Sequence, residues 1–160
     1  MNQRKEYKVY EGSFLTEIPK FDQSVNILRF IDPEEREYTI LVNRAYLTKE
    51  QNTEAFCEAQ MAFMENTIPG FATEGKQLKS EIGPAKLSVV QIANRFLQDG
   101  KSMKQVQSFV SLPYHEVINP AKKNLIIFTL TTEEDFTDYQ RRHYVQIINS
   151  FNPDVSELKK

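Results

Sequence analysis

Few residues in this sequence are suited to nucleophilic or acid–base chemistry: the two histidines, His115 and His143, and the single cysteine, Cys57. A Cys–His pair could supply a nucleophile and a general base, but only with both side chains within hydrogen-bond reach. Cys57 lies in the middle of an expected helix, without a basic or nucleophile-elbow context. His115 falls in an expected loop, and His143 lies in the apolar stripe of another expected helix, where a packed role is more common. We therefore expect no Cys–His catalytic pair.

The sequence also gives no clear motif for a metal or a cofactor. The acidic run 133–135 could be read as a metal site, but acidic residues at a helix start explain it better. Arg141-Arg142 and Lys122-Lys123 form a weak anion patch at most. There is no GxGxxG, no Walker A loop and no HExxH motif. The sequence predicts a binding protein that is not an enzyme and needs no metal or cofactor.

The bulk composition sets further limits. A chain of 160 residues fits one domain, taken here as residues 1–160 with a core at about 7–152. A formal net charge of -2 gives no general attraction for nucleic acid or an anionic membrane. One cysteine allows no intramolecular disulfide. The charged N-terminus is not followed by an apolar run, and no apolar stretch approaches ~20 residues, so neither a signal peptide nor membrane insertion is expected. The expected compartment is the cytoplasm.

The stretch 21–44 organises the expected fold. Residues 24–30 and 37–44 are predicted to form two strands joined by the polar turn 32–35. Alternate residues of a strand point to opposite faces of a sheet, and here both faces carry large aliphatic side chains. An apolar surface that is left uncovered usually marks a binding site for a partner.

The first expected helix starts at Thr48, because Thr48-Lys49-Glu50-Gln51 has the form of a capping box, and it ends at Pro69-Gly70. A helical wheel places Gln60, Met61 and Met64 beside Cys57 and leaves only a narrow wedge of glutamates for water. Two interpretations stay open. The helix is either deeply buried in its own domain, or its Gln60/Met61/Met64 side faces a ligand, a use to which methionine is well suited.

The remaining pattern favours a sheet followed by a helix. Residues 71–82 are expected to form a strand, and Asp99-Gly100 predicts a hairpin between 87–97 and 103–112. Residues 125–130 form a compact apolar run typical of a central strand, and a last helix is expected from Thr132 to about Asn152. The predicted fold is α+β: a single domain with a curved, mostly antiparallel sheet and two main helices.

Three motifs in this order resemble a known family: Tyr10-Glu11-Gly12-Ser13-Phe14, Asp22-Gln23-Ser24-Val25-Asn26-Ile27 and Tyr38-Thr39-Ile40-Leu41-Val42-Asn43-Arg44. They are similar to the DcrB-like family and, more narrowly, to the Eag chaperones of type VI secretion effectors. The resemblance implies a Mog1/PsbP-like fold and a cup-shaped homodimer. It also implies a chaperone that binds the N-terminal transmembrane helices of a PAAR-domain effector, Rhs-type effectors included, and keeps them soluble before secretion.

The same resemblance implies a groove. Apolar strand positions after the Asp-Gln motif line it in the family, and glutamines hydrogen-bond the bound helices. The expected effector-binding residues are Val25, Ile27, Ile40, Val42, Gln60, Met61, Met64 and Gln107. Gln105 shares the face of Gln107, so either could contact the client. The face of the sheet that forms the groove also stays open, with the Asn26/Leu28/Leu41 side as the alternative.

Two other functions fit the same pattern. One is a Mog1/PsbP-like interaction or regulatory domain that binds a soluble partner through a flatter, more polar patch. The other is a periplasmic DcrB relative. The absence of a signal peptide or lipobox cysteine counts against the second, because the lone Cys57 is predicted to lie within a helix.

Overall fold

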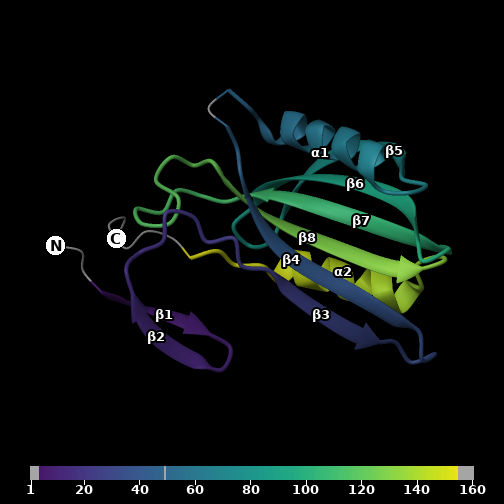
Figure 1. Cartoon of the computed structure of the whole chain (residues 1–160), viewed down its shortest axis with the longest axis horizontal. Helices are drawn as coiled ribbons and strands as arrows, with labels where there is room; N and C mark the ends of the chain where they lie inside the picture. The colour runs from purple at the N-terminus through teal and green to yellow at the C-terminus, as the bar shows by residue number, and fades with distance from the viewer. Residues whose placement is uncertain (1–3, 49, 155–160) are drawn as a thin grey trace.

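The computed structural model describes residues 4–48 and 50–154. Six antiparallel strands form one sheet in the order β3-β4-β8-β7-β6-β5, and β1 and β2 form a separate hairpin (Figure 1). The elements are β1 (Lys5–Val9), β2 (Gly12–Thr16), β3 (Asn26–Ile31), β4 (Glu37–Tyr46), α1 (Thr53–Thr67), β5 (Ala72–Ile82), β6 (Leu87–Gln98), β7 (Lys101–Ser111), β8 (Asn124–Glu133) and α2 (Asp138–Ser150). The predicted α+β class is confirmed.

The hairpins follow from local turn chemistry. Asp99 and Gly100 both have positive φ, 52° and 78°, as a tight turn between twisted strands requires. They join β6 and β7, whose register runs unbroken from Val89↔Val110 to Gln98↔Lys101. The apolar run predicted as a central strand is β8, which pairs with β4 on one side and β7 on the other. These sequence predictions are therefore confirmed.

Each face of the sheet carries one helix and one hydrophobic core. The α2 face packs residues from five strands against α2: Tyr38, Ile40, Ile82, Leu87, Val89, Val110, Ile126, Phe128, Leu130, Tyr144 and Ile148. The α1 face packs a smaller set against α1: Leu47, Cys57, Met61, Phe71, Val90, Ile92, Phe109, Leu125 and Ile127. The apolar character of both sheet faces thus reflects a helix on each side, with α2 beneath β8 and β4 and α1 beside β5 and β6 in Figure 1.

The start of α1 differs from the prediction. The helix begins at Thr53, and Asn52 is its N-cap, whose side-chain oxygen accepts from the backbone N–H of Ala55 at 2.8 Å. The Gln51 side chain instead accepts from the backbone N–H of Thr48 at 3.3 Å, outside the helix. Lys49, the second residue of the expected capping box, lies outside the described residues. The predicted start was wrong because a local turn and a helix cap share the same residue types.

The start of α2 also differs from the prediction. Strand β8 continues through Thr132 to Glu133, because Thr132 pairs with both neighbouring strands. The helix begins only at Asp138, with Thr137 as its N-cap. Thr137 and Gln140 form a reciprocal capping box, with both hydrogen bonds at 3.2 Å. The acidic run therefore ends a strand and forms a turn rather than starting a helix.

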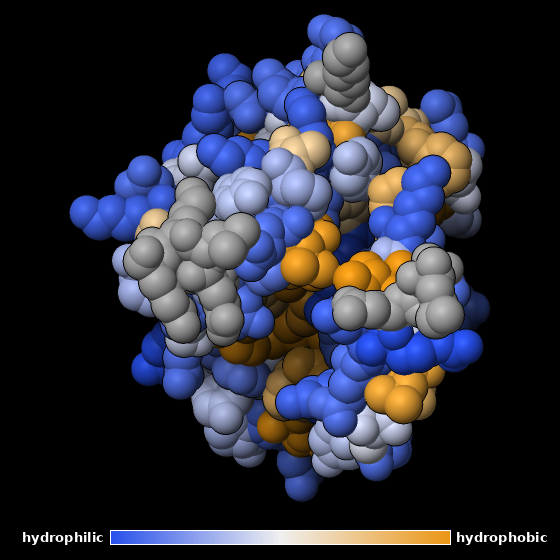
Figure 2. All heavy atoms as spheres, turned by 90° about the vertical axis from the view of Figure 1, so that its left-hand side faces the viewer, coloured by the Kyte–Doolittle hydropathy of each residue, from blue (hydrophilic) through white to orange (hydrophobic). Residues whose placement is uncertain are grey.

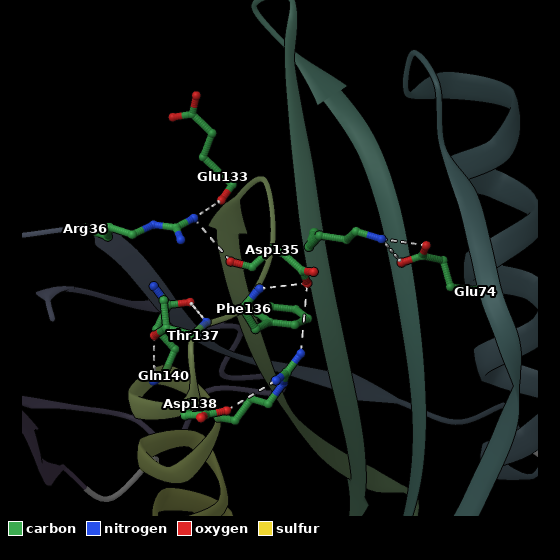
Figure 3. Close-up of polar contacts among 10 residues, drawn as sticks. Arg36, Glu74, Glu133, Asp135, Phe136, Thr137, Asp138 and Gln140 are labelled. Atoms are coloured by element: carbon green, nitrogen blue, oxygen red, sulfur yellow. Dashed lines mark hydrogen bonds and ion pairs between the residues drawn. The ribbon is translucent and has the colours of Figure 1, made fainter. Parts of the chain in front are cut away.

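The turn before α2 is held by side chains from the β3–β4 connection. Figure 3 shows the Arg36 guanidinium donating to the main-chain oxygens of Glu133 at 2.9 Å and Asp135 at 3.2 Å. Buried Asp32 accepts from the Thr137 hydroxyl at 3.2 Å and from two backbone N–H groups of its own turn. Burial alone would raise the pKa of Asp32, but these hydrogen bonds hold it below its ordinary value.

Candidate functional site

The contacts of α1 determine which part of the sheet it leaves open. Glu54 forms an ion pair with Lys79 of β5 at 2.9 Å, and its main-chain oxygen accepts from Gln77. This side of α1 therefore faces β5. At about 100° per residue, Gln60 and Phe63 lie on the side of the helix turned away from β5, toward β8 and β4. The helix thus presents these two side chains toward sheet that it does not cover.

We call the uncovered area the open sheet face. It is the part of the α1 side formed by β3, β4 and the C-terminal half of β8, with Ile27, Arg29, Thr39, Leu41, Asn43, Thr129 and Thr131 on it. Ile27 is 59% exposed and Leu41 is partly exposed. Neither belongs to the core under α1. The open sheet face therefore joins solvent-accessible apolar side chains to a polar stripe.

A polar stripe formed by Asn43, Thr129, Gln107, Asn94 and Gln105 runs from the open sheet face toward the core under α1. The Asn94 side-chain N–H₂ donates to Gln105 and to Gln107, each at 3.1 Å. Gln107 lies directly opposite Thr129 in the β7–β8 register. Both glutamines therefore belong to one network, in which Gln107 is buried and Gln105 is partly exposed.

Three buried oxygens of this stripe have no hydrogen-bond partner in the described structure: Asn43 Oδ1, Asn94 Oδ1 and Thr129 Oγ1. All three side chains are on the α1 side of the sheet. Buried polar atoms are normally paired, and an unpaired one costs about 1–3 kcal/mol. All three oxygens are buried, so a bound group could reach them only if neighbouring side chains moved.

The strand register divides the predicted binding residues between two faces. Ile27 lies opposite Leu41, whereas Leu28 lies opposite Ile40. Ile27 is therefore on the open sheet face, while Ile40 is fully buried under α2 and Val42 packs against the same core. The expectation that Ile27 and Val42 line one groove is wrong, as is the alternative grouping of Leu28 with Leu41, because adjacent strand residues alternate between faces. Val25 precedes β3 and is exposed.

The helix residues of the prediction are also divided. Met61 is buried beside Cys57 in the core under α1, so it has no surface to offer a ligand. Met64 packs partly against that core. Gln60 is half-buried on the side of α1 nearest the open sheet face. Of the helix set, Gln60 and the partly exposed Met64 stay available for contact, and their role in binding stays a prediction.

A separate cleft lies at the other end of the sheet, where β4 ends and β8 begins. It has a volume of about 920 Å³. Apolar residues from the β2–β3 connection, the β7–β8 connection and the segment after α2 line it, among them Ile18, Phe21, Val117, Ile118 and Phe151. Figure 2 shows orange, apolar side chains at the bottom of this hollow. None of the eight predicted binding residues lines this cleft.

The residues suited to catalysis are used structurally. Burial raises the pKa of the Cys57 thiol to about 11, so the thiol is neutral near pH 7. Nδ1 of His115 accepts the backbone N–H groups of Val117 and Ile118 at 3.1 and 3.2 Å. His143 Nδ1 lies 2.7 Å from the Tyr38 hydroxyl. Within residues 4–48 and 50–154, no group of three His, Cys, Asp or Glu side chains could hold a metal.

Sequence reasoning missed Asn43, Asn94 and Thr129. Each lies in a strand that carries several other polar residues, so the local pattern does not single it out. Their common face becomes apparent only when the strand order and register are known. The same structure contains no helix, among the described residues, that is long and apolar enough to cross a membrane.

Two solved structures share the fold of this chain. A solved structure from Pseudomonas aeruginosa, PA94, is described as a protein of unknown function and candidate regulator. It matches with a TM-score of 0.71 at 18% identity, over 94% of this chain and 97% of that one. LpqN from Mycobacterium tuberculosis, described as involved in cell envelope biogenesis, matches with a TM-score of 0.50 at 14% identity, over 93% and 89%. At such identities these likenesses show the fold alone.

No curated protein matches the chain significantly. The family model for DcrB matches residues 11–150. This match covers both helices and all strands except β1. The chain belongs to the DcrB family.

Proposed function

We propose that this protein is a cytoplasmic chaperone whose open sheet face binds the N-terminal transmembrane helices of a PAAR-domain type VI secretion effector. The protein shields these helices from water and helps to load the effector for secretion. The proposal includes a homodimer and no catalytic step. It joins the sequence resemblance to the Eag chaperones with the surface chemistry of the open sheet face.

The observation that carries the proposal is the set of solvent-accessible apolar side chains on the open sheet face, beside the half-buried Gln60. Exposed Ile27 and partly exposed Leu41 would contact the apolar side chains of a client helix. The half-buried Gln60 amide, on the side of α1 nearest this face, would exchange hydrogen bonds with serine or threonine hydroxyls on that helix. Interfaces between membrane helices are rich in such small polar residues, and the bound helix satisfies its own backbone hydrogen bonds.

Co-expression with a defined client tests the proposal. The probe is an N-terminal segment of a PAAR-domain effector that includes its transmembrane helices, fused to a soluble reporter. We expect the wild-type chain to keep the segment in the soluble fraction and to co-purify with it. Ile27→Asp should abolish this, because a charge on the open sheet face would have to be desolvated by the client.

Val145→Asp is the matched control. Val145 is a half-exposed aliphatic residue on α2, on the opposite side of the sheet, at 50% exposure against 59% for Ile27. Both variants should melt close to the wild type, since both sites are largely solvated. Equal protection by Ile27→Asp and the wild type would refute the placement of the client, and failure of the wild-type chain would refute the function.

A second candidate, an interaction domain for a soluble partner, is favoured by the cleft of about 920 Å³ at the strand ends. Its lining mixes apolar residues such as Ile118 with charged ones such as Arg44 and Lys20, as a soluble partner would require. Ile118→Asp distinguishes the two candidates. It should leave the binding of the membrane segment unchanged under the chaperone proposal.

A further inference from the structure

The cleft at the strand ends has apolar walls that neither hydrophobic core uses (Figure 2). The β2–β3 connection contributes Ile18 and Phe21, which are 53% and 52% exposed, and the β7–β8 connection contributes Val117 and Ile118, at 50% and 57%. A volume of about 920 Å³ lies within the range of small-molecule sites, ~300–1,000 Å³. Half-exposed apolar side chains that converge on one hollow give a ligand apolar surface to bury.

The β7–β8 wall of the cleft is held in place by hydrogen bonds. Asn119, which is 1% exposed, donates to the main-chain oxygens of Leu112 at 3.0 Å and Pro113 at 2.8 Å. Its side-chain oxygen accepts from the backbone N–H groups of residues 123–124 at 3.0 and 3.1 Å. Nδ1 of His115 accepts the backbone N–H groups of the two apolar residues of this wall. The wall is therefore preformed, as a ligand site requires.

Three cations line the same cleft without a carboxylate partner: Lys5, Lys20 and Arg44. None of them forms an ion pair with a carboxylate in the described part of the chain. Arg44 is partly buried, and its hydrogen bonds use Nη1 alone, which donates to the Ser24 main-chain oxygen at 2.9 Å and the Asn26 side-chain oxygen at 2.8 Å. Its Nε and Nη2 groups form an edge that can bind a carboxylate through two parallel hydrogen bonds.

Most of the carboxylates around the cleft have partners of their own. Hydrogen bonds from the Ser24 and Tyr7 hydroxyls hold the pKa of Asp22 below its ordinary value. Glu6 lies on the opposite face of β1 from Tyr7, and its carboxylate accepts from a serine hydroxyl of β2 at 3.2 Å. The two remaining acidic residues of the lining, the first with an interaction of its own and the second exposed, are Glu17 and Asp154. The charges without a partner are therefore mainly positive.

We propose that this cleft binds an amphiphilic carboxylate, a small molecule with one anionic head group and an aliphatic chain, of the class of medium-chain fatty acids. The carboxylate binds the Nε/Nη2 edge of Arg44, and the chain packs against Phe21 and Ile118. Each methylene group that the cleft removes from water should tighten binding by roughly fourfold. The site is separate from the open sheet face, so it goes beyond the proposed function and does not depend on a client.

Isothermal titration calorimetry of the purified full chain tests the ligand class. The probes are decanoate, decanol and decyltrimethylammonium, which share a chain and differ in the charge of the head group, each below the concentration at which it aggregates. We expect saturable binding of one decanoate per chain, at least tenfold tighter than decanol, and no binding of the ammonium probe. Octanoate should bind roughly fifteen-fold more weakly than decanoate, because it lacks two methylene groups.

Variants of the lining test the assignment of the head group and the chain. Arg44→Gln should weaken decanoate binding to the level of decanol and leave decanol binding unchanged, which also shows that the variant is folded. Ile118→Asp, at an exposed position, should abolish the binding of both probes without a change in melting profile. Val145→Asp on α2 and Ile27→Asp on the open sheet face are the controls and should bind decanoate like the wild type.

Four outcomes would overturn the ligand site. Equal affinities for decanoate and decanol, or tighter binding of the ammonium probe, would refute the anionic head group. No saturable binding of any probe would refute a small-molecule ligand and leave the cleft to a segment of a soluble protein. Equal weakening by Val145→Asp and Ile118→Asp would show non-specific adsorption of the chain. Decanoate binding by a protein that holds no membrane segment would refute the proposed function and leave the ligand site intact.

Discussion

Ile27 and Ile40 offer the sharpest test of how the β3–β4 hairpin distributes its side chains. The two residues are on neighbouring strands, where Leu28, the residue after Ile27, lies opposite Ile40. Because of this offset they point to opposite faces. Ile40 is 0% exposed in the core under α2, while Ile27 is 59% exposed on the open sheet face. Replacing each with alanine therefore removes the same atoms from two contrasting environments.

The expected magnitudes follow from burial. Removing a fully buried isoleucine side chain to alanine costs about 2–5 kcal/mol, so Ile40→Ala should lower the free energy of unfolding by that amount. Full burial of such a side chain is worth ~1.5–3 kcal/mol, and Ile27 has less than half of its surface buried, so Ile27→Ala should cost about 1 kcal/mol or less. For a chain of this length, each kcal/mol shifts Tm by roughly 2–4 °C.

Urea denaturation followed by circular dichroism measures both variants. The protein concentration must be the same throughout, because dimerisation links stability to concentration. The m-values should match that of the wild type, so that the midpoints report stability alone. Equal costs for Ile27→Ala and Ile40→Ala, or a larger cost for Ile27→Ala, would refute the register and with it the definition of the open sheet face.

Three further predictions concern stability. Tyr144→Phe should lower the free energy of unfolding by about 1–3 kcal/mol, because the Tyr144 hydroxyl hydrogen-bonds the buried Ser108 hydroxyl at 2.5 Å and the main-chain oxygen of Phe128 at 2.9 Å. An unchanged free energy of unfolding in urea denaturation would contradict this. Because the pKa of Asp32 is lowered in the folded state, its contribution to stability is present above its unfolded-state pKa and is lost as pH falls through its lower folded-state value. Asp32→Asn should therefore make the free energy of unfolding fall less steeply at acid pH than in the wild type. Parallel profiles of the two proteins against pH would refute this. Asn52→Ala should lower the free energy of unfolding by about 1 kcal/mol and Thr48→Ala by much less, because only Asn52 caps α1. Urea denaturation of the two variants side by side measures this difference, and equal losses would contradict it.

The sequence identified the elements better than their ends. Asp99-Gly100 was sufficient to place the β6–β7 hairpin, because few other turns suit those residues. The prediction of a helix start at Thr132 was wrong, because a helix start and a strand end followed by a turn use the same acidic residue types. Pairing of Thr132 with Tyr38 and Lys104 decided the outcome, and such long-range pairing cannot be read from a local pattern.

The candidate site was harder to predict for the same reason. Ile27 is exposed, but its partner across the hairpin depends on the register that the turn imposes. A shift of one residue exchanges Leu41 for Ile40 opposite Ile27 and thereby exchanges the two faces. The position of the three unpaired oxygens on one face depends on that register as well, so no sequence motif identifies them. Whether these residues bind a client stays a prediction.

Photo-crosslinking in the cells that express this protein tests the chaperone proposal most directly. A benzophenone amino acid at Ile27 would sample the open sheet face, and the same probe at Val145 would sample the opposite side of the molecule. The proposal predicts that Ile27 crosslinks to an apolar stretch of about 20 residues near the N-terminus of a PAAR-domain protein, and that Val145 does not. Crosslinks from Ile27 only to polar segments of soluble proteins, or the same partners from both positions, would contradict it.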